Sequence, residues 1–253
     1  MIGFVPLLGK EIREQWRTRR LLVVAIVFAI FGIGSPLLAR YTPELIRALA
    51  SEELARAIPP PTIADAVDQF LKNLGQTGVL AAILLAMGSV ASDKERGIAA
   101  LLLTKPVSRG AYLLSKLLAI GVTLLVGVAL AGAAAYGYTA WLFEPLAIGG
   151  YAAMCALLFL QLLCYATLTF LGSTLTRSAL AAAGIGIAAL VLVATVSALP
   201  EIGRYTPGGL AEPARALALG QPTASLVQPL GASIGLVVIV FGLAWLSFRR
   251  QEL

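Results

Sequence analysis

Six long segments without a charged residue dominate the sequence and leave few folds open. They are residues 21–39, 73–92, 117–143, 145–176, 178–200 and 216–248. Each is close to the ~20 apolar residues that a helix needs to cross a bilayer, and none alternates as barrel strands do. We therefore predict an all-α integral membrane protein, a single transmembrane domain over residues 1–253. Its transmembrane helices are expected at 21–39, 75–92, 113–140, 149–175, 179–199 and 227–248.

The first of these segments is interpreted as a span rather than as a signal peptide. A signal peptide has a short basic region, an apolar stretch and a small-residue cleavage site. Here twenty residues precede the apolar segment, and residues 34–39 offer no convincing site.

Composition excludes several functional classes. The chain is 59% hydrophobic and 13% charged, whereas soluble domains are about 45–50% apolar and about 25% charged. A soluble enzyme, a disordered chain and a nucleic-acid-binding domain are therefore excluded. The sequence has no histidine, which removes histidine-based metal sites, Ser-His-Asp triads and histidine proton shuttles. We expect no catalytic residue and no bound metal.

The charged residues predict the orientation in the membrane. With six spans both termini lie on one side, and that side carries 13 basic and five acidic residues, a net charge of +8. The other side carries six basic and eight acidic residues, a net charge of −2. Cytoplasmic loops are enriched in lysine and arginine. We therefore expect both termini in the cytoplasm, and the net charge of +6 reflects topology rather than nucleic-acid binding.

The uncharged spans bear on how such a protein could be driven. Secondary transporters and pumps commonly use ionisable residues inside the membrane, and none lies in the six segments. The chain also lacks a phosphate-binding loop, since Gly9-Lys10 is followed by Glu11 and not by serine or threonine. Any energy for transport is therefore expected to enter through a separate motor at the cytoplasmic surface.

Residues 4–20 have the pattern of an interfacial amphipathic helix. At 100° per residue the apolar side chains share one arc and the basic side chains lie opposite, as in helices that lie in the membrane interface. The alternative is a soluble extension of the first span with scattered positive charge. The apolar residues are Phe4, Val5, Leu8, Ile12 and Trp16, and the basic residues are Lys10, Arg13, Arg17 and Arg20.

The loop at residues 93–109 predicts a short amphipathic helix between the second and third spans. Ser92 and Glu95 have the spacing of a capping box, and Ile98, Leu101 and Leu102 form one apolar face. Pro106 is expected to end the helix, and Ser108 is expected to cap the next one. An exposed apolar stripe of this kind marks an interface; a helix resting on lipid headgroups is an equal alternative.

This loop resembles the cytoplasmic loop of the type-2 ABC-transporter permease family. Those permeases carry a comparable charged stretch with glycine, a leucine run and Pro-Val-Ser-Arg before the third span. The tail at residues 248–253 and the order of the elements are also similar. The resemblance implies that the loop helix couples to an ATPase. The residues that would contact it are Asp93, Glu95, Arg96, Gly97, Ile98, Leu101, Leu102, Pro106, Val107, Ser108 and Arg109.

The resemblance further implies the membrane permease subunit of an ATP-driven ABC exporter in a prokaryotic inner membrane. Two separate ATP-binding subunits would hold ATP and Mg²⁺, so that this chain binds no cofactor and is not an enzyme. A second permease copy or a paralogue and membrane lipid are the other expected partners, and nucleic acid is not one. The alternative function is a polytopic scaffold that recruits a partner protein without transport.

The outer segments and a few polar or small residues in the spans give further expectations. In the outer loop at 40–74, Thr42-Pro43-Glu44 should start one helix, and Thr62 with Asp65 should cap a second one that ends at Gly75. This loop could pack over the spans, cover the pathway, touch the outer leaflet or receive an extracytoplasmic partner. A short helix is expected at 212–219. We expect Gly231 and Gly235 to allow close approach of helices, and we expect Gln161 to form a hydrogen bond to another span.

Overall fold

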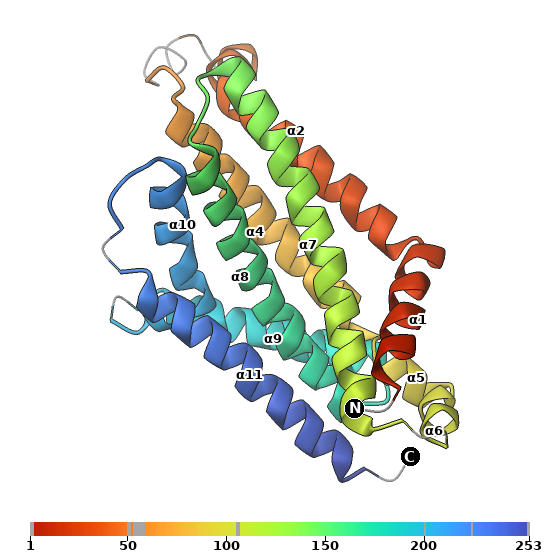
Figure 1. Ribbon diagram of the computed structural model, residues 1–253. Helices are drawn as coiled ribbons and strands as arrows, with labels where there is room; N and C mark the ends of the chain where they lie inside the picture. The colour runs from red at the N-terminus through yellow and green to blue at the C-terminus, as the bar shows by residue number, and fades with distance from the viewer. Residues whose placement is uncertain are drawn as a thin grey trace.

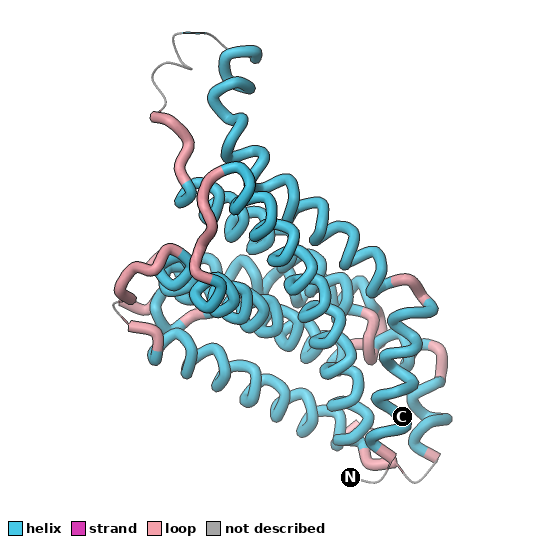
Figure 2. Tube along the Cα trace, turned by 45° about the horizontal axis from the view of Figure 1, so that its top comes forward, coloured by secondary structure: helices cyan, strands magenta, loops and turns pink. Residues whose placement is uncertain are grey.

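The computed structural model describes residues 3–49, 52, 59–104, 107–199, 201–223 and 225–251. All regular elements in these residues are helices (Figures 1 and 2). The α-helices are α1 (Phe4–Arg17), α2 (Arg20–Leu49), α4 (Ile63–Met87), α5 (Ala91–Glu95), α6 (Ile98–Leu103), α7 (Arg109–Leu142), α8 (Ile148–Leu175), α9 (Ala179–Ser197), α10 (Ala211–Ala218) and α11 (Val227–Arg249), and two 3₁₀ turns, η1 (Gly203–Tyr205) and η2 (Pro207–Leu210), precede α10.

Six helical segments of the described chain are long and apolar enough to cross a membrane, which confirms the predicted fold class. They are α2, the near-continuous pair α4 and α5, α7, α8, α9 and α11. Each overlaps one of the expected spans. The chain is therefore a multi-pass membrane protein.

The first span is longer than the sequence pattern suggested. A separate helix starting at Thr42 is wrong, because α2 continues through Pro36 and Pro43 to Leu49. The hydroxyl groups of Ser35 and Thr42 donate to the carbonyl groups four residues earlier, each over 2.6 Å. Such side-chain bonds let a membrane helix accommodate proline, so these residues do not break it.

The second outer helix and the second span are likewise one helix. The capping box at Thr62 is confirmed: its backbone N–H donates to Asp65 Oδ2 over 2.7 Å, and its hydroxyl accepts from the Asp65 N–H. The expected end at Gly75 is wrong, since α4 runs on to Met87. The apolar face of Val67, Phe70 and Leu74 is buried, and its packing outweighs the helix-weakening effect of one glycine, about 1 kcal/mol.

Helices α7 and α8 form the centre of the bundle. Helix α7 packs along α2 and α1, while α8 contacts α4, α9, α10 and α11. Both chain termini lie at one end, next to α5 and α6 (Figure 1); we refer to it as the terminal end. The largest fully buried side chains include Tyr112, Phe28, Phe70, Phe170 and Phe248.

The segment before the last span folds against the opposite end of the bundle. The expected short helix at 212–219 is present as α10. Arg215 Nε donates to Asp68 Oδ1 of α4 over 2.6 Å. Gly150 of α8 lies against the carbonyl group of Leu217, where a side chain would not fit. These contacts hold α10 onto α4 and α8, and η2 also contacts α8.

In the described part of the chain, the residues singled out for helix packing make no close contact or hydrogen bond to another span. Positions for a Cβ atom at Gly231 and Gly235 of α11 have no atom within 4 Å. Gln161 is partly buried and makes no side-chain hydrogen bond among the described residues, so the expected bond to another span is absent here. The close approach occurs instead at Gly32, where a Cβ atom would lie 2.5 Å from the Ala131 carbonyl oxygen.

We predict that Gly32→Ala destabilises the bundle by about 1–3 kcal/mol, because the added methyl group meets backbone atoms of α7 that cannot move without separating the helices. Thermal unfolding of the purified protein in detergent measures the loss. Gly34→Ala is the matched control, because nothing lies within 4 Å of a Cβ atom there. Equal unfolding midpoints for the two variants would contradict the role of Gly32.

Candidate functional site

The segment between α4 and α7 forms two short helices rather than the single helix predicted. A helix start at Ser92 is wrong, because Ser92 lies inside α5. The N–H groups of Val90 and Ala91 donate instead to Ser173 Oγ of α8, over 3.1 and 2.9 Å. A cap contributed by a residue some eighty positions away has no local sequence signal.

Glycine separates the two short helices. Gly97 has a φ of +70° and caps the start of α6, a left-handed conformation that glycine adopts at little cost. The chain therefore turns sharply between α5 and α6 at the terminal end (Figure 1). The cap predicted at Ser108 is confirmed, since its hydroxyl accepts from the Ala111 N–H over 3.2 Å.

Among the described side chains of α6, one large apolar side chain extends into the surroundings. Leu101 is 69% exposed, whereas Leu102 and Val107 pack against the buried core and Ile98 is half-buried. Glu95, Arg96 and Gly97 are also exposed. Pro106 lies outside the described residues. The exposed part of the predicted contact set is thus Glu95, Arg96, Gly97, Leu101 and Ser108.

A buried ion cluster fixes the base of this segment. Lys116 Nζ lies 2.9 Å from Asp93 Oδ2 and 3.2 Å from Glu11 Oε2, and the three side chains are 4%, 13% and 8% exposed. The Tyr112 hydroxyl donates to the same Asp93 oxygen over 2.7 Å. The cluster joins α1, α5 and α7. Asp93 was predicted to contact a partner, and the structure instead directs its carboxylate inward.

The N-terminal helix packs through a face that the amphipathic pattern did not single out. Leu7, Glu11 and Gln15 are buried, and α1 contacts α7. Trp16 and Val5, on the predicted apolar arc, are 65% and 76% exposed. These apolar side chains are free to meet lipid, and an interfacial location of α1 remains a prediction.

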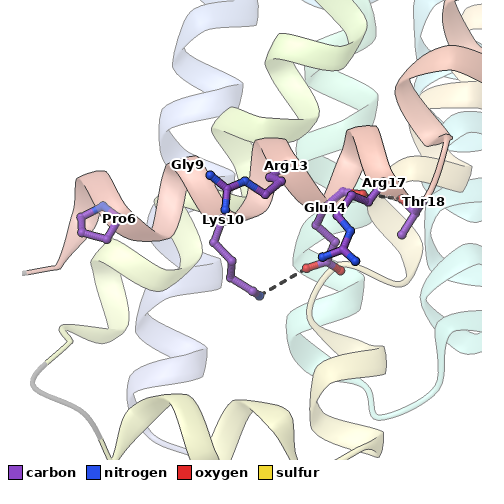
Figure 3. Close-up of a pocket in the computed structure, with 7 residues that line it drawn as sticks. All are labelled: Pro6, Gly9, Lys10, Arg13, Glu14, Arg17 and Thr18. Atoms are coloured by element: carbon purple, nitrogen blue, oxygen red, sulfur yellow. Dashed lines mark hydrogen bonds and ion pairs between the residues drawn. The ribbon is translucent and has the colours of Figure 1, made fainter.

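The basic side of α1 borders a groove of about 640 Å³ (Figure 3). Lys10 Nζ lies 3.0 Å from Glu11 Oε1 and 3.3 Å from Glu14 Oε2. Partial burial disfavours the ammonium group, but the two carboxylates outweigh it and raise the pKa of Lys10. Arg13 and Arg17 have no ion-pair partner in the described part of the chain. The lining residues are Pro6, Gly9, Lys10, Arg13, Glu14, Arg17 and Thr18.

Arg109 is also used within the chain. Its Nη1 atom lies within 3.0 Å of the carbonyl oxygens of Phe248, Arg249 and Gln251 at the end of α11. The guanidinium thus binds carbonyl groups that have no partner inside the helix. Of the predicted contact residues, Asp93 and Arg109 therefore hold the segment in place, while the exposed ones remain available.

Sequence reasoning missed the residues that brace the segment from a distance. Neither Glu11 nor Ser173 nor Gln251 was predicted to belong to the site. They contact Lys116, Ala91 and Lys94, which are 105, 82 and 157 residues away in the chain, and no local pattern reports such pairs. In the described residues no group of three or more acidic or cysteine side chains could hold a metal ion.

These features define a polytopic helical membrane protein with a short, braced apolar helix at the end that carries both termini. Residues 5–253 match the family described as ABC-2 family transporter protein, and the chain belongs to that family. It is a membrane permease subunit of an ABC transporter, which makes it a transport subunit rather than a catalytic one. The family implies an ATP-binding partner.

Two relatives illustrate the similarity. The chain is 30% identical over 253 residues to the transmembrane protein YxlG of Bacillus subtilis (strain 168), and the match covers 98% of each chain. It is 32% identical over 142 residues to the probable ABC transporter permease protein NosY of Stutzerimonas stutzeri, covering 55% of this chain and 46% of that one.

We predict that Lys116→Met destabilises the protein by about 3–5 kcal/mol, because it leaves the buried Asp93 carboxylate without a cation and leaves Glu11 with only the partly exposed Lys10. Unfolding in mixed micelles measures the change. Lys10→Met is the control, since that side chain is 41% exposed and an exposed pair contributes at most about 1 kcal/mol. The triple variant Glu11→Gln, Asp93→Asn, Lys116→Met should recover much of the loss. Similar effects for Lys116→Met and Lys10→Met would contradict the role of the cluster.

Proposed function

We propose that this permease subunit belongs to an ATP-driven exporter and that α5–α6 is the coupling segment, seated in a cleft of a separate cytoplasmic ATP-binding subunit. The observation that carries the proposal is Leu101, an apolar side chain 69% exposed on a short helix with a fixed base. Exposed apolar surface on a braced helix is typical of an interaction site. Glu95 and Arg96 flank it as polar contacts.

The proposed mechanism follows from how the segment is attached. ATP brings two ATP-binding subunits together and displaces their clefts. A segment seated in a cleft moves with it, and the ion cluster of Glu11, Asp93 and Lys116 passes the displacement to α1 and α7. The energy comes from the different affinities of ATP for two states of the assembly. ATP and Mg²⁺ would be held by the partner, and this chain would hold neither.

A second permease copy or a paralogue would complete the pathway. In α7 and α8, 56% of the most apolar window is buried, compared with 17% in α9 and α11. The poorly covered helices leave apolar faces, and no atom of the described residues lies within 4 Å of a Cβ position at Gly231 or Gly235 of α11. Small residues allow close approach of helices in a membrane. These faces support a dimer, with lipid covering what remains.

The terminal end is proposed to face the cytoplasm of a prokaryotic cell with this subunit in its inner membrane. The support is the net charge of +8 at this end compared with −2 at the other. Export of an apolar or amphipathic cargo is supported by the uncharged spans. The α2 and α4 extensions at the opposite end could receive an extracytoplasmic partner.

We predict that Leu101→Asp leaves the protein folded in the membrane but reduces co-purification of its ATP-binding subunit and permease-dependent ATPase activity at least tenfold, because a charge cannot enter an apolar cleft. Pull-down followed by ATPase assay in nanodiscs measures both. Thr104→Asp, at the exposed end of the same helix, is the control and should cause a smaller loss. Full binding and activity of Leu101→Asp would refute the coupling role.

Orientation is tested by accessibility of single cysteines in a background with Cys155 and Cys164 replaced by alanine. Thr104→Cys lies at the terminal end and Glu144→Cys lies in the α7–α8 turn at the opposite end, and both positions are exposed. A membrane-impermeant maleimide added to spheroplasts should label Glu144→Cys and should label Thr104→Cys only after lysis. The reverse pattern would place the termini outside.

A further inference from the structure

The tail after α11 is bound into the base of the coupling segment. The last carbonyl groups of a helix lack partners within it and carry the negative end of its dipole. Arg109 Nη1 lies 3.0 Å from the Phe248 oxygen, 2.8 Å from the Arg249 oxygen and 3.0 Å from the Gln251 oxygen. A guanidinium group there satisfies these carbonyls and joins the start of α7 to the end of α11.

The Gln251 side chain extends this junction to two more helices. Its Oε1 atom accepts from Lys94 Nζ of α5 over 3.0 Å, and its Nε2 group donates to the Thr174 carbonyl at the end of α8 over 2.9 Å. Lys94 Nζ also donates to the same Thr174 carbonyl over 2.6 Å. One amide thus connects α5 with α8, and it uses both its donor and its acceptor.

Apolar packing supports the junction from within the bundle. The rings of Tyr112 and Phe248 stack with centroids 5.6 Å apart, and both side chains are fully buried. Tyr112 in turn donates to Asp93 of the ion cluster. The terminal end of α11 is therefore linked to the cluster by direct contacts, although most of this helix is poorly covered.

We propose that Gln251 is a positioning residue that makes the coupling segment and α11 move as one body. The proposal rests on the coupling function proposed above. The covalent chain connects α5–α6 only to α4 and α7. Ser173 and Lys94 already join α5 to α8, and the Gln251 and Arg109 contacts add α11, so that a displacement received at α6 reaches the last span directly. Loss of the amide would remove the direct link between α5 and the tail of α11 without altering the exposed surface of α6, and Arg109 and Phe248 would hold α11 to α7 alone.

The test is a distance measurement between spin labels at Thr104→Cys on α6 and Leu246→Cys on α11, in the background lacking Cys155 and Cys164. Both labelled positions are exposed. The full-length permease with its ATP-binding subunit is measured in nanodiscs, without nucleotide and with a non-hydrolysable ATP analogue. Gln251→Ala is compared with Arg250→Ala, which alters an exposed neighbour whose side chain forms no hydrogen bond or ion pair with the described residues of α5 or α8.

We expect one narrow distance distribution, unchanged by nucleotide, for the native tail and for Arg250→Ala. Gln251→Ala should broaden the distribution at least twofold and shift it on adding the analogue. Gln251→Glu keeps the acceptor for Lys94 but loses the donor to Thr174, so an intermediate width is expected. Co-purification of the ATP-binding subunit should stay within twofold of the unmodified protein.

Distributions for Gln251→Ala that match those of Arg250→Ala in both states would overturn the proposal. Failure of the proposed function has a different signature, because the ATP-binding subunit would then not co-purify with the unmodified protein. In that case the purified permease alone, measured without nucleotide, would still show whether Gln251→Ala broadens the distance distribution between the two spin labels. If Gln251→Ala lowers the folded yield, Gln251→Glu provides the same comparison with a smaller change of side chain.

Discussion

Lys116 is the charge on which the arrangement of the terminal end depends. Its ammonium group is almost completely removed from water and is balanced by the carboxylates of Glu11 and Asp93. A buried ion is tolerated only when opposite charges and hydrogen bonds surround it. Helices α1, α5 and α7 must therefore meet at this point, and the position of α6 follows from theirs.

The loop that contains α6 has two sets of residues, one that attaches the loop to the bundle and one that is exposed for contact with a partner. Residues that face inward, such as Asp93 and Arg109, hold the loop against the bundle. Leu101 faces outward on a helix of six residues that begins at the left-handed Gly97. A short helix alone is marginal in water, so its use as a rigid contact requires the tertiary contacts at its base.

The limits of prediction from sequence are visible at particular residues. The uncharged segments predicted six spans because a bilayer leaves few alternatives, and the caps at Thr62 and Ser108 were predictable because both partners are three residues apart. The helix boundaries at Thr42 and Gly75 were wrong, since the hydroxyl bonds of Ser35 and Thr42 accommodate proline in α2 and the buried face of α4 outweighs one glycine. At the candidate site, exposure of Leu101 and inward placement of Asp93 depend on neighbours distant in sequence.

The sequence by itself determined that the chain is a helical membrane protein with six spans and an uneven charge distribution, because these properties depend only on local apolarity and on where charges are allowed. The tertiary structure alone decided which loop residues brace the bundle and which remain exposed. Ser173, Lys116 and Gln251 act on α5 across large sequence separations. Such contacts arise from the packing of whole helices, which no local pattern specifies.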